Sequence, residues 1–142
     1  MITYVDAGEA MRERVGREWG EVAARHMHLR DGFSIVALDG GELMGLIAIV
    51  WRELPPPLAA TEAYIDIIEV AAAHRRHGIA SELIQLSAAR AREQRAYQLR
   101  AWSSSDKSEA LALWRALGFG LHPATTFSGG VAVEGFFVTR AV

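Results

Sequence analysis

The chain of 142 residues is 51% hydrophobic and 23% charged, with a formal net charge of −2. These values are typical of a single soluble domain, expected to cover residues 1–142, and nothing in them indicates nucleic acid as the main partner. The absence of cysteine excludes disulfides, thiolate metal sites and a cysteine nucleophile. The longest apolar run, residues 43–51, is far shorter than the ~20 residues that span a membrane. Residues 1–15 also lack the order of a secretory signal, so we expect a cytoplasmic protein without a membrane partner.

Seven short runs rich in apolar residues, separated by turn or loop residues, predict the strands of one sheet. The fourth run is apolar on both faces and is expected at the centre of the sheet. Gly40 and Gly41 favour a hairpin turn between the second and third runs, and the prolines of residues 54–58 favour a loop after the third. In chain order the predicted strands are residues 2–5, 33–38, 43–51, 64–70, 97–102, 119–127 and 133–140.

Three segments have the pattern of helices, at about residues 8–28, 78–95 and 110–117. Asp6 is placed to cap the first, and Gly16 and Gly20 favour its division into two helices. Asp106 and Glu109 have the spacing of a capping box at the start of the third. The alternation of strands and helices predicts one α/β domain with a mixed sheet.

The segment between the fourth strand and the second helical segment has the chemistry of a phosphate site. Arg75, Arg76 and His77 precede Gly78, which lets a ligand approach the backbone closely. A helix that starts here offers unpaired N–H groups and the positive end of its dipole. A basic surface loop with no ligand has the same composition and is the alternative. The Walker loop and the dinucleotide fingerprint are both absent.

Two motifs resemble those of the GNAT superfamily of acyl-CoA-dependent N-acyltransferases. Residues 75–80, RRHGIA, match its Q/R-x-x-G-x-G/A signature, and residues 110–119, ALALWRALGF, resemble its A-x-x-x-Y-x-x-x-G-F stretch. Both occur in the order and setting that the family has. The resemblance implies a single-domain GNAT-like α/β fold. Its mixed, mostly antiparallel sheet would have splayed fourth and fifth strands and would be flanked by helices.

The resemblance implies acetyl-CoA as co-substrate and no metal. Backbone N–H groups of residues 76–80, with the Ser81 hydroxyl, would hold the CoA pyrophosphate, and the main chain of residues 68–70 would pair with the pantetheine arm. Lys107 stands where the family often has an asparagine that contacts CoA. The residues expected to bind the cofactor are Ile68, Val70, Arg75, Arg76, His77, Gly78, Ile79, Ala80, Ser81, Lys107 and Trp114.

Trp114 is the main departure from the family pattern, because it occupies the position of the family's frequent tyrosine. That tyrosine is the usual acid for the departing thiolate. An indole N–H donates hydrogen bonds but does not ionise usefully, so Trp114 cannot take this role. The substitution keeps open an alternative in which the protein binds or senses acyl-CoA without catalysis.

Glu69, followed by Asp66, is the candidate base that takes the proton of an attacking amine. The two acids lie in the fourth strand and are an odd number of positions apart, so we expect them to face opposite sides of the sheet. Either could instead pair with an arginine or the backbone. His26 and His28 point apart at helical spacing and predict no metal site.

Together these features predict a transferase that moves an acetyl or other short acyl group from acyl-CoA to a primary amine. The reaction would be direct attack in a ternary complex. The acceptor amine is not identified by the sequence: a small metabolite, an antibiotic and a protein N-terminus all fit. A homodimer is an additional expectation, because dimers are common in the family.

Overall fold

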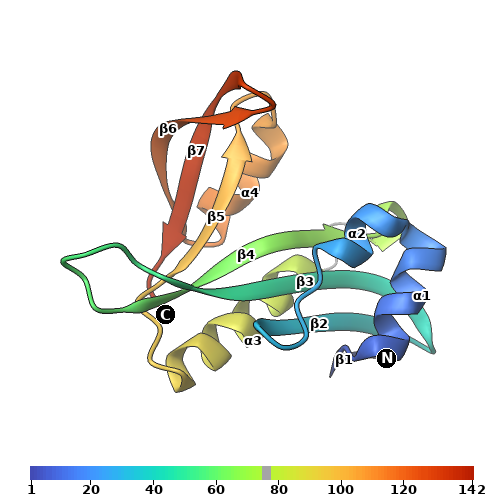
Figure 1. Cartoon of the computed structure of the whole chain (residues 1–142). Helices are drawn as coiled ribbons and strands as arrows, with labels where there is room; N and C mark the ends of the chain where they lie inside the picture. Colours follow the sequence, from blue (N-terminus) through green and yellow to red (C-terminus); the bar gives the residue numbers. More distant parts are fainter. Residues whose placement is uncertain (75–77) are drawn as a thin grey trace.

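The computed structural model describes residues 1–74 and 78–142, which form a seven-stranded sheet with helices on both faces (Figure 1). Across the sheet the order is β1-β2-β3-β4-β5-β7-β6, and neighbours are antiparallel except β4 and β5. The seven predicted strands are confirmed, with small shifts at their ends. The elements are β1 (Ile2–Asp6), α1 (Glu9–Trp19), α2 (Glu21–Arg25), β2 (Gly32–Asp39), β3 (Glu42–Glu53), β4 (Thr61–Val70), the 3-10 turn η1 (Ala72–His74), α3 (Ile79–Glu93), β5 (Leu99–Ser104), α4 (Ser108–Ala116), β6 (Gly120–Ser128) and β7 (Val131–Arg140).

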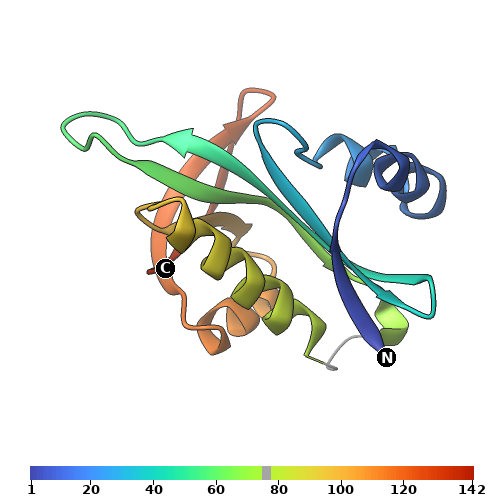
Figure 2. The same ribbon diagram turned by 90° about the horizontal axis from the view of Figure 1, so that it is seen from below.

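Each face of the sheet buries its own apolar cluster. Figure 2 shows α3 and α4 on one side of the sheet, and α1 with the segment that follows it on the other. On the α3 side, Leu83 packs in one cluster with Ile47 and Ile65; on the α1 side, Val15 packs in another with Leu46. Full burial of a side chain of this size contributes ~1.5–3 kcal/mol, so the two clusters fix the helices against the sheet. None of the helices in the described part of the chain is both long and apolar enough to cross a lipid bilayer.

The first helical region divides at Gly20, as predicted, where φ is +105°. The predicted cap of this region is wrong. Gly8 is the N-cap of α1 and makes no side-chain cap bond. Asp6 instead accepts a hydrogen bond from Arg90 Nη1 of α3 at 2.6 Å. Local spacing predicts that the Asp6 carboxylate caps α1, but it instead pairs with Arg90, which is distant in the chain.

The capping box predicted for the last helix is also wrong. Lys107 is the N-cap of α4, and no side-chain cap bond forms there. Asp106 accepts a hydrogen bond from Ser104 Oγ at 2.6 Å and so holds the turn after β5. At the other end, α4 stops before Gly118, whose φ of +87° is in the left-handed region typical of a helix C-terminus.

The parallel ladder between β4 and β5 is short. Its paired positions are Ala63 with Leu99 and Tyr64 with Arg100. Beyond them β4 continues to Val70 and β5 to Ser104, and the two strands separate (Figure 1). The predicted splay of the fourth and fifth strands is confirmed.

A buried ion pair lies next to this short ladder. Glu62 of β4 is fully buried, and its carboxylate accepts hydrogen bonds from Arg100 Nε at 2.8 and 3.0 Å. Gln98 Nε2 donates a further bond at 2.9 Å. The charge of Glu62 is thus neutralised only while β4 and β5 stay together at this end.

Replacing Arg100 with Leu should lower the free energy of unfolding by ~3–5 kcal/mol, because Glu62 is left buried without its cation. The double variant Glu62→Leu/Arg100→Leu should recover most of this loss, since no buried charge then remains. Urea unfolding followed by circular dichroism measures both changes.

Arg52→Leu is the matched control. The Arg52 guanidinium carbon lies 3.7 Å from the centroid of the Tyr64 ring, and Arg100 lies over the same ring at 5.3 Å. Arg52 forms no ion pair with a carboxylate in residues 1–74 and 78–142. Its loss should cost less than ~1 kcal/mol. Equal destabilisation by Arg52→Leu and Arg100→Leu would contradict the role of the buried pair.

Candidate active site

A β-bulge interrupts β4 just beyond the β4–β5 ladder. Ala48 of β3 is opposite Ile67, whereas the next residue, Ile49, is opposite Ile65. Asp66 is therefore the additional residue of β4, with no partner of its own in β3. A bulge of this kind changes the direction of the side chains that follow it.

The bulge places both candidate acids on one face of the sheet. Ile65 and Ile68, three positions apart, both pack in the apolar cluster on the α3 side, whereas Ile67 packs in the cluster on the α1 side. Asp66 and Glu69 consequently face the α1 side together. The expectation that they face opposite sides is wrong, because it assumed unbroken alternation along the strand. Glu69 is exposed, and Asp66 is partly buried.

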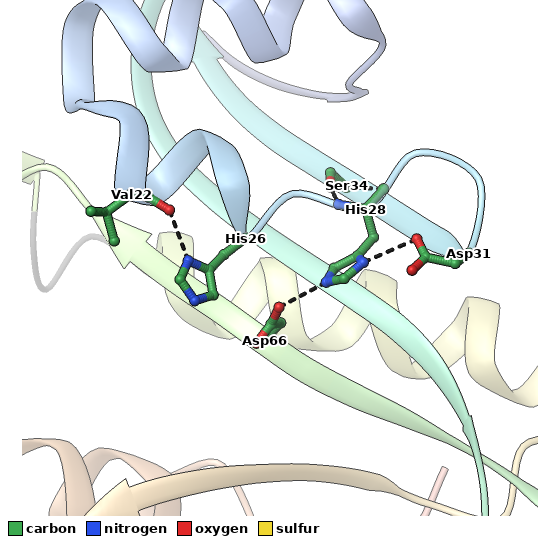
Figure 3. A network of polar contacts seen from close by, with 6 residues as sticks. All are labelled: Val22, His26, His28, Asp31, Ser34 and Asp66. Carbon is green, nitrogen blue, oxygen red and sulfur yellow. Dashed lines mark hydrogen bonds and ion pairs between the residues drawn. The ribbon is translucent and has the colours of Figure 1, made fainter. Parts of the chain in front are cut away.

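The Asp66 side chain is hydrogen-bonded to His28, which lies in the connection between α2 and β2 (Figure 3). His28 Nε2 lies 2.8 Å from Asp66 Oδ2, and His28 Nδ1 lies 3.0 Å from Asp31 Oδ1. The side chains of Asp66 and His28 are 25% and 17% exposed, whereas that of Asp31 is 66% exposed. One imidazole thus joins a carboxylate on the sheet to a carboxylate at the surface.

His28 is the residue of this group that the sequence did not identify. The two-residue spacing draws attention to His28 and His26 as a pair, but His26 Nδ1 lies 2.8 Å from the Val22 carbonyl oxygen and its ring has different neighbours (Figure 3). No local spacing points to the contact with Asp66, which is 38 positions away.

Tyr64 precedes Asp66 on the same face, since Ala63 and Ile65 on either side of it pack toward α3. Burial raises the pKa of the Tyr64 phenol, and this effect exceeds the opposing influence of the Arg52 and Arg100 guanidinium groups. The phenol therefore keeps its proton to a higher pH than an exposed tyrosine.

The start of α3 lies after the end of β4. Gly78 has a left-handed φ of +79° and is the N-cap of this 15-residue helix; apart from its chain neighbours, no atom of the described residues lies within 4 Å of the position a Cβ would take. The first helical bond runs from the Glu82 N–H to the Gly78 carbonyl, so the N–H groups of residues 79–81 have no partner within the helix. Ile79 is buried, whereas Ala80 and Ser81 are partly exposed.

The other predicted cofactor residues lie on β4 and α4 or outside the described residues. Ile68 and Val70 are half-buried on the α3 side of β4. Lys107 is exposed at the N-cap of α4. Trp114 is buried, with its ring 4.8 Å from that of Phe119 in an edge-to-face arrangement. Three predicted contacts lie outside the described residues: Arg75, Arg76 and His77.

Comparison with known proteins gives a family and a shared fold. The model of the acetyltransferase (GNAT) family matches residues 4–119. NAA60 from Arabidopsis thaliana, solved in complex with acetyl-CoA, has a similar structure (TM-score 0.78, 16% identity, 100% of both chains covered). So does yncA, a putative acetyltransferase from Salmonella typhimurium solved with acetyl-CoA (TM-score 0.72, 16% identity, 99% of this chain and 94% of that one). A putative phosphinothricin N-acetyltransferase gives a TM-score of 0.70 at 19% identity, covering 100% of this chain and 99% of its own.

A search of curated protein sequences found no significant match. The family match nevertheless spans most of the chain. Two structural features agree with it: β4 separates from β5 beyond a short ladder, and Gly78 is the N-cap of α3. The chain belongs to the acetyltransferase (GNAT) family.

Proposed function

We propose that this protein transfers an acetyl or other short acyl group from acyl-CoA to a primary amine, by direct attack in a ternary complex. The observation that carries the proposal is the pairing of β4 with β5 at two positions only, in a chain of this family. Beyond those positions, β4 is followed along the chain by η1 and the start of α3. The face of β4 that is turned toward α1 carries the two acids, Asp66 and Glu69. In the proposed complex, the thioester would lie beyond the β4–β5 ladder and the amine beside the acid face of β4.

The start of α3 has the chemistry that the CoA pyrophosphate requires. The N–H groups of residues 79–81 have no helical partner, and in the described part of the chain no atom beyond the neighbours of Gly78 blocks the approach of an anion to its backbone. Ser81 would add a hydroxyl, and Arg75, Arg76 and His77 would add charge. Bound acyl-CoA supplies the activated acyl group. Lys107, Trp114 and the main chain of residues 68–70 complete the proposed contacts.

The acid face of β4 has the chemistry that the amine requires. The amine nitrogen attacks the carbonyl carbon, the C–S bond breaks, and the CoA thiolate leaves. The proton lost from the nitrogen passes to a carboxylate, for which Asp66 and Glu69 are the candidates. Asp66 is the better placed, since it lies two positions beyond the last paired residue and is partly enclosed.

The second candidate function is binding or sensing of acyl-CoA without turnover. The observation that favours it is Trp114, which occupies the position of the family's usual acid and packs as a core residue.

An assay of thiol release from acetyl-CoA with a panel of primary amines separates the two functions. We expect steady release that depends on the amine for at least one member of the panel, whether a small metabolite, an aminoglycoside or a peptide with a free N-terminus. Tight binding of acetyl-CoA with no release above the rate in water would instead support the sensing function.

Gly78→Asp should weaken CoA binding at least ~10-fold, because it adds a negative charge where phosphate is expected. Gly78→Asn is the matched control: it has the same size, also tolerates a left-handed φ, and carries no charge. Calorimetric titration with CoA gives both dissociation constants. Equal affinity of the two variants would contradict the placement of the phosphates.

The rate constant kcat should rise with loss of a proton from the amine or base and then stay level to pH ~9–10, because Trp114, at the position of the family's usual tyrosine acid, has no proton that titrates in this range. Tyr64 keeps its phenol proton here, since burial raises its pKa. Trp114→Phe should give the same profile, because it keeps an aromatic ring beside Phe119 and removes the indole N–H. A fall in kcat on the alkaline side, or loss of turnover in Trp114→Phe with intact CoA binding, would indicate a proton donor at or near this position.

A further inference from the structure

The backbone of His28 is fixed by a buried side chain of β2. Ser34 is 1% exposed, and its Oγ accepts a hydrogen bond from the His28 N–H at 3.0 Å. The same hydroxyl donates to the His28 carbonyl oxygen at 3.0 Å. Met27, the neighbour of His28, is buried in the α1-side cluster. The histidine is therefore held to the sheet independently of its ring contacts.

Each ring nitrogen of His28 lies within hydrogen-bond distance of a carboxylate oxygen. An ionised carboxylate only accepts hydrogen bonds, so the 2.8 Å contact with Asp66 requires a proton on Nε2. The 3.0 Å contact with Asp31 requires one on Nδ1 by the same reasoning. A ring that carries both protons donates to both carboxylates at once, and both hydrogen bonds are then charge-assisted.

This arrangement leaves one oxygen of Asp66 for another partner. Oδ2 is held by His28, whereas Oδ1 has no hydrogen-bond partner in the part of the chain that the structure describes. Glu69, on the same face, is exposed and has no ion pair with the described residues. Only one of the two candidate acids is therefore fixed in orientation.

The three groups do not form a metal site. The two ring nitrogens of His28 point in different directions, toward Asp31 and Asp66 respectively (Figure 3). Because the carboxylates contact different ring nitrogens, the three side chains do not converge on one point. Among the described residues, no group of three or more His, Asp or Glu is arranged to hold a metal ion.

We infer that His28 is a positioning residue for acyl transfer: it holds Asp66 through Oδ2 so that Asp66 Oδ1 takes the proton of the attacking amine. The ammonium form of the amine first gives a proton to Asp66 Oδ1. The freed nitrogen then attacks the carbonyl carbon, the C–N bond forms, the C–S bond breaks, the thiolate leaves with the bonding electrons, and the second nitrogen proton neutralises it. Asp31 supports the ring from the other side. This inference rests on the proposed acyl transfer to an amine.

The test compares two amines of similar size, one mostly protonated at the assay pH and one mostly neutral. The protonated amine needs a base, whereas the neutral amine arrives ready to attack. His28→Ala should lower kcat/KM for the basic amine by ~10²-fold, and for the neutral amine by no more than ~3-fold. The affinity for CoA should not change. A purely structural role for His28 would reduce the rates with both amines equally.

Three variants complete the design. His28→Gln should recover most of the loss, because its side-chain N–H can replace Nε2–H toward Asp66. Asp66→Asn should show the same preference for the neutral amine, and its loss should not add to that of His28→Ala in the double variant. His26→Ala is the matched control, since His26 lies beside the same connection and, among the described residues, its ring is hydrogen-bonded to the Val22 backbone carbonyl and not to a carboxylate; it should behave as the parent.

Several results would overturn the inference. These are equal losses with both amines, parental activity in His28→Ala, additive losses in the double variant, or no recovery in His28→Gln. If His28→Ala fails to fold by circular dichroism, His28→Gln and Asp66→Asn decide the question through the same pair of amines. Absence of turnover in the parent with every amine is a different result, because it removes the proposed function and the inference with it.

Discussion

The short parallel contact between β4 and β5 is the constraint on which the rest of the site depends. Strands that pair along their whole length leave no edge for a ligand, whereas strands that do not pair at all are not held in one sheet. Here the ladder has two paired positions, and the buried bonds between Glu62 and Arg100 lie next to them. The ion pair is satisfied only when the strands stay together at this end. Their other ends can therefore separate without loss of the sheet.

The bulge at Asp66 lets a single strand present different chemistry on its two faces. Ile65 and Ile68 keep the α3 side apolar, and Asp66 and Glu69 gather on the side of α1. Strict alternation would have sent one of the acids toward α3, where a charge would be buried among apolar side chains at considerable cost. The bulge thus removes a conflict between the apolar cluster and the acid face.

The sequence predicted the elements well and their long-range contacts poorly. Strands and turns follow from local alternation and from residues such as Gly40, so the seven strands were found near their observed bounds. The two predicted caps failed because the carboxylates found other partners, 84 positions away in the case of Asp6. The bulge was not predictable, because it exists only relative to the register of β3. The contact of His28 with Asp66 depends on the same tertiary placement, so local sequence patterns do not indicate it.

Trp114 packs in the core and supplies no acid for the leaving thiolate. The proposed reaction therefore depends mainly on the groups that deprotonate the acceptor amine. Trp114 is 7% exposed and packs edge-to-face with Phe119, just after the left-handed Gly118 that ends α4. A ring held in this way contributes to packing, and its N–H is not an acid. This loss is tolerable because a thiolate, the conjugate base of a group with a pKa near ~8.5, is a fair leaving group without protonation. An acceptor amine in its ammonium form, by contrast, has no free lone pair and cannot attack until it loses a proton. The greater catalytic requirement therefore lies at the amine, on the face where Asp66 is held by His28.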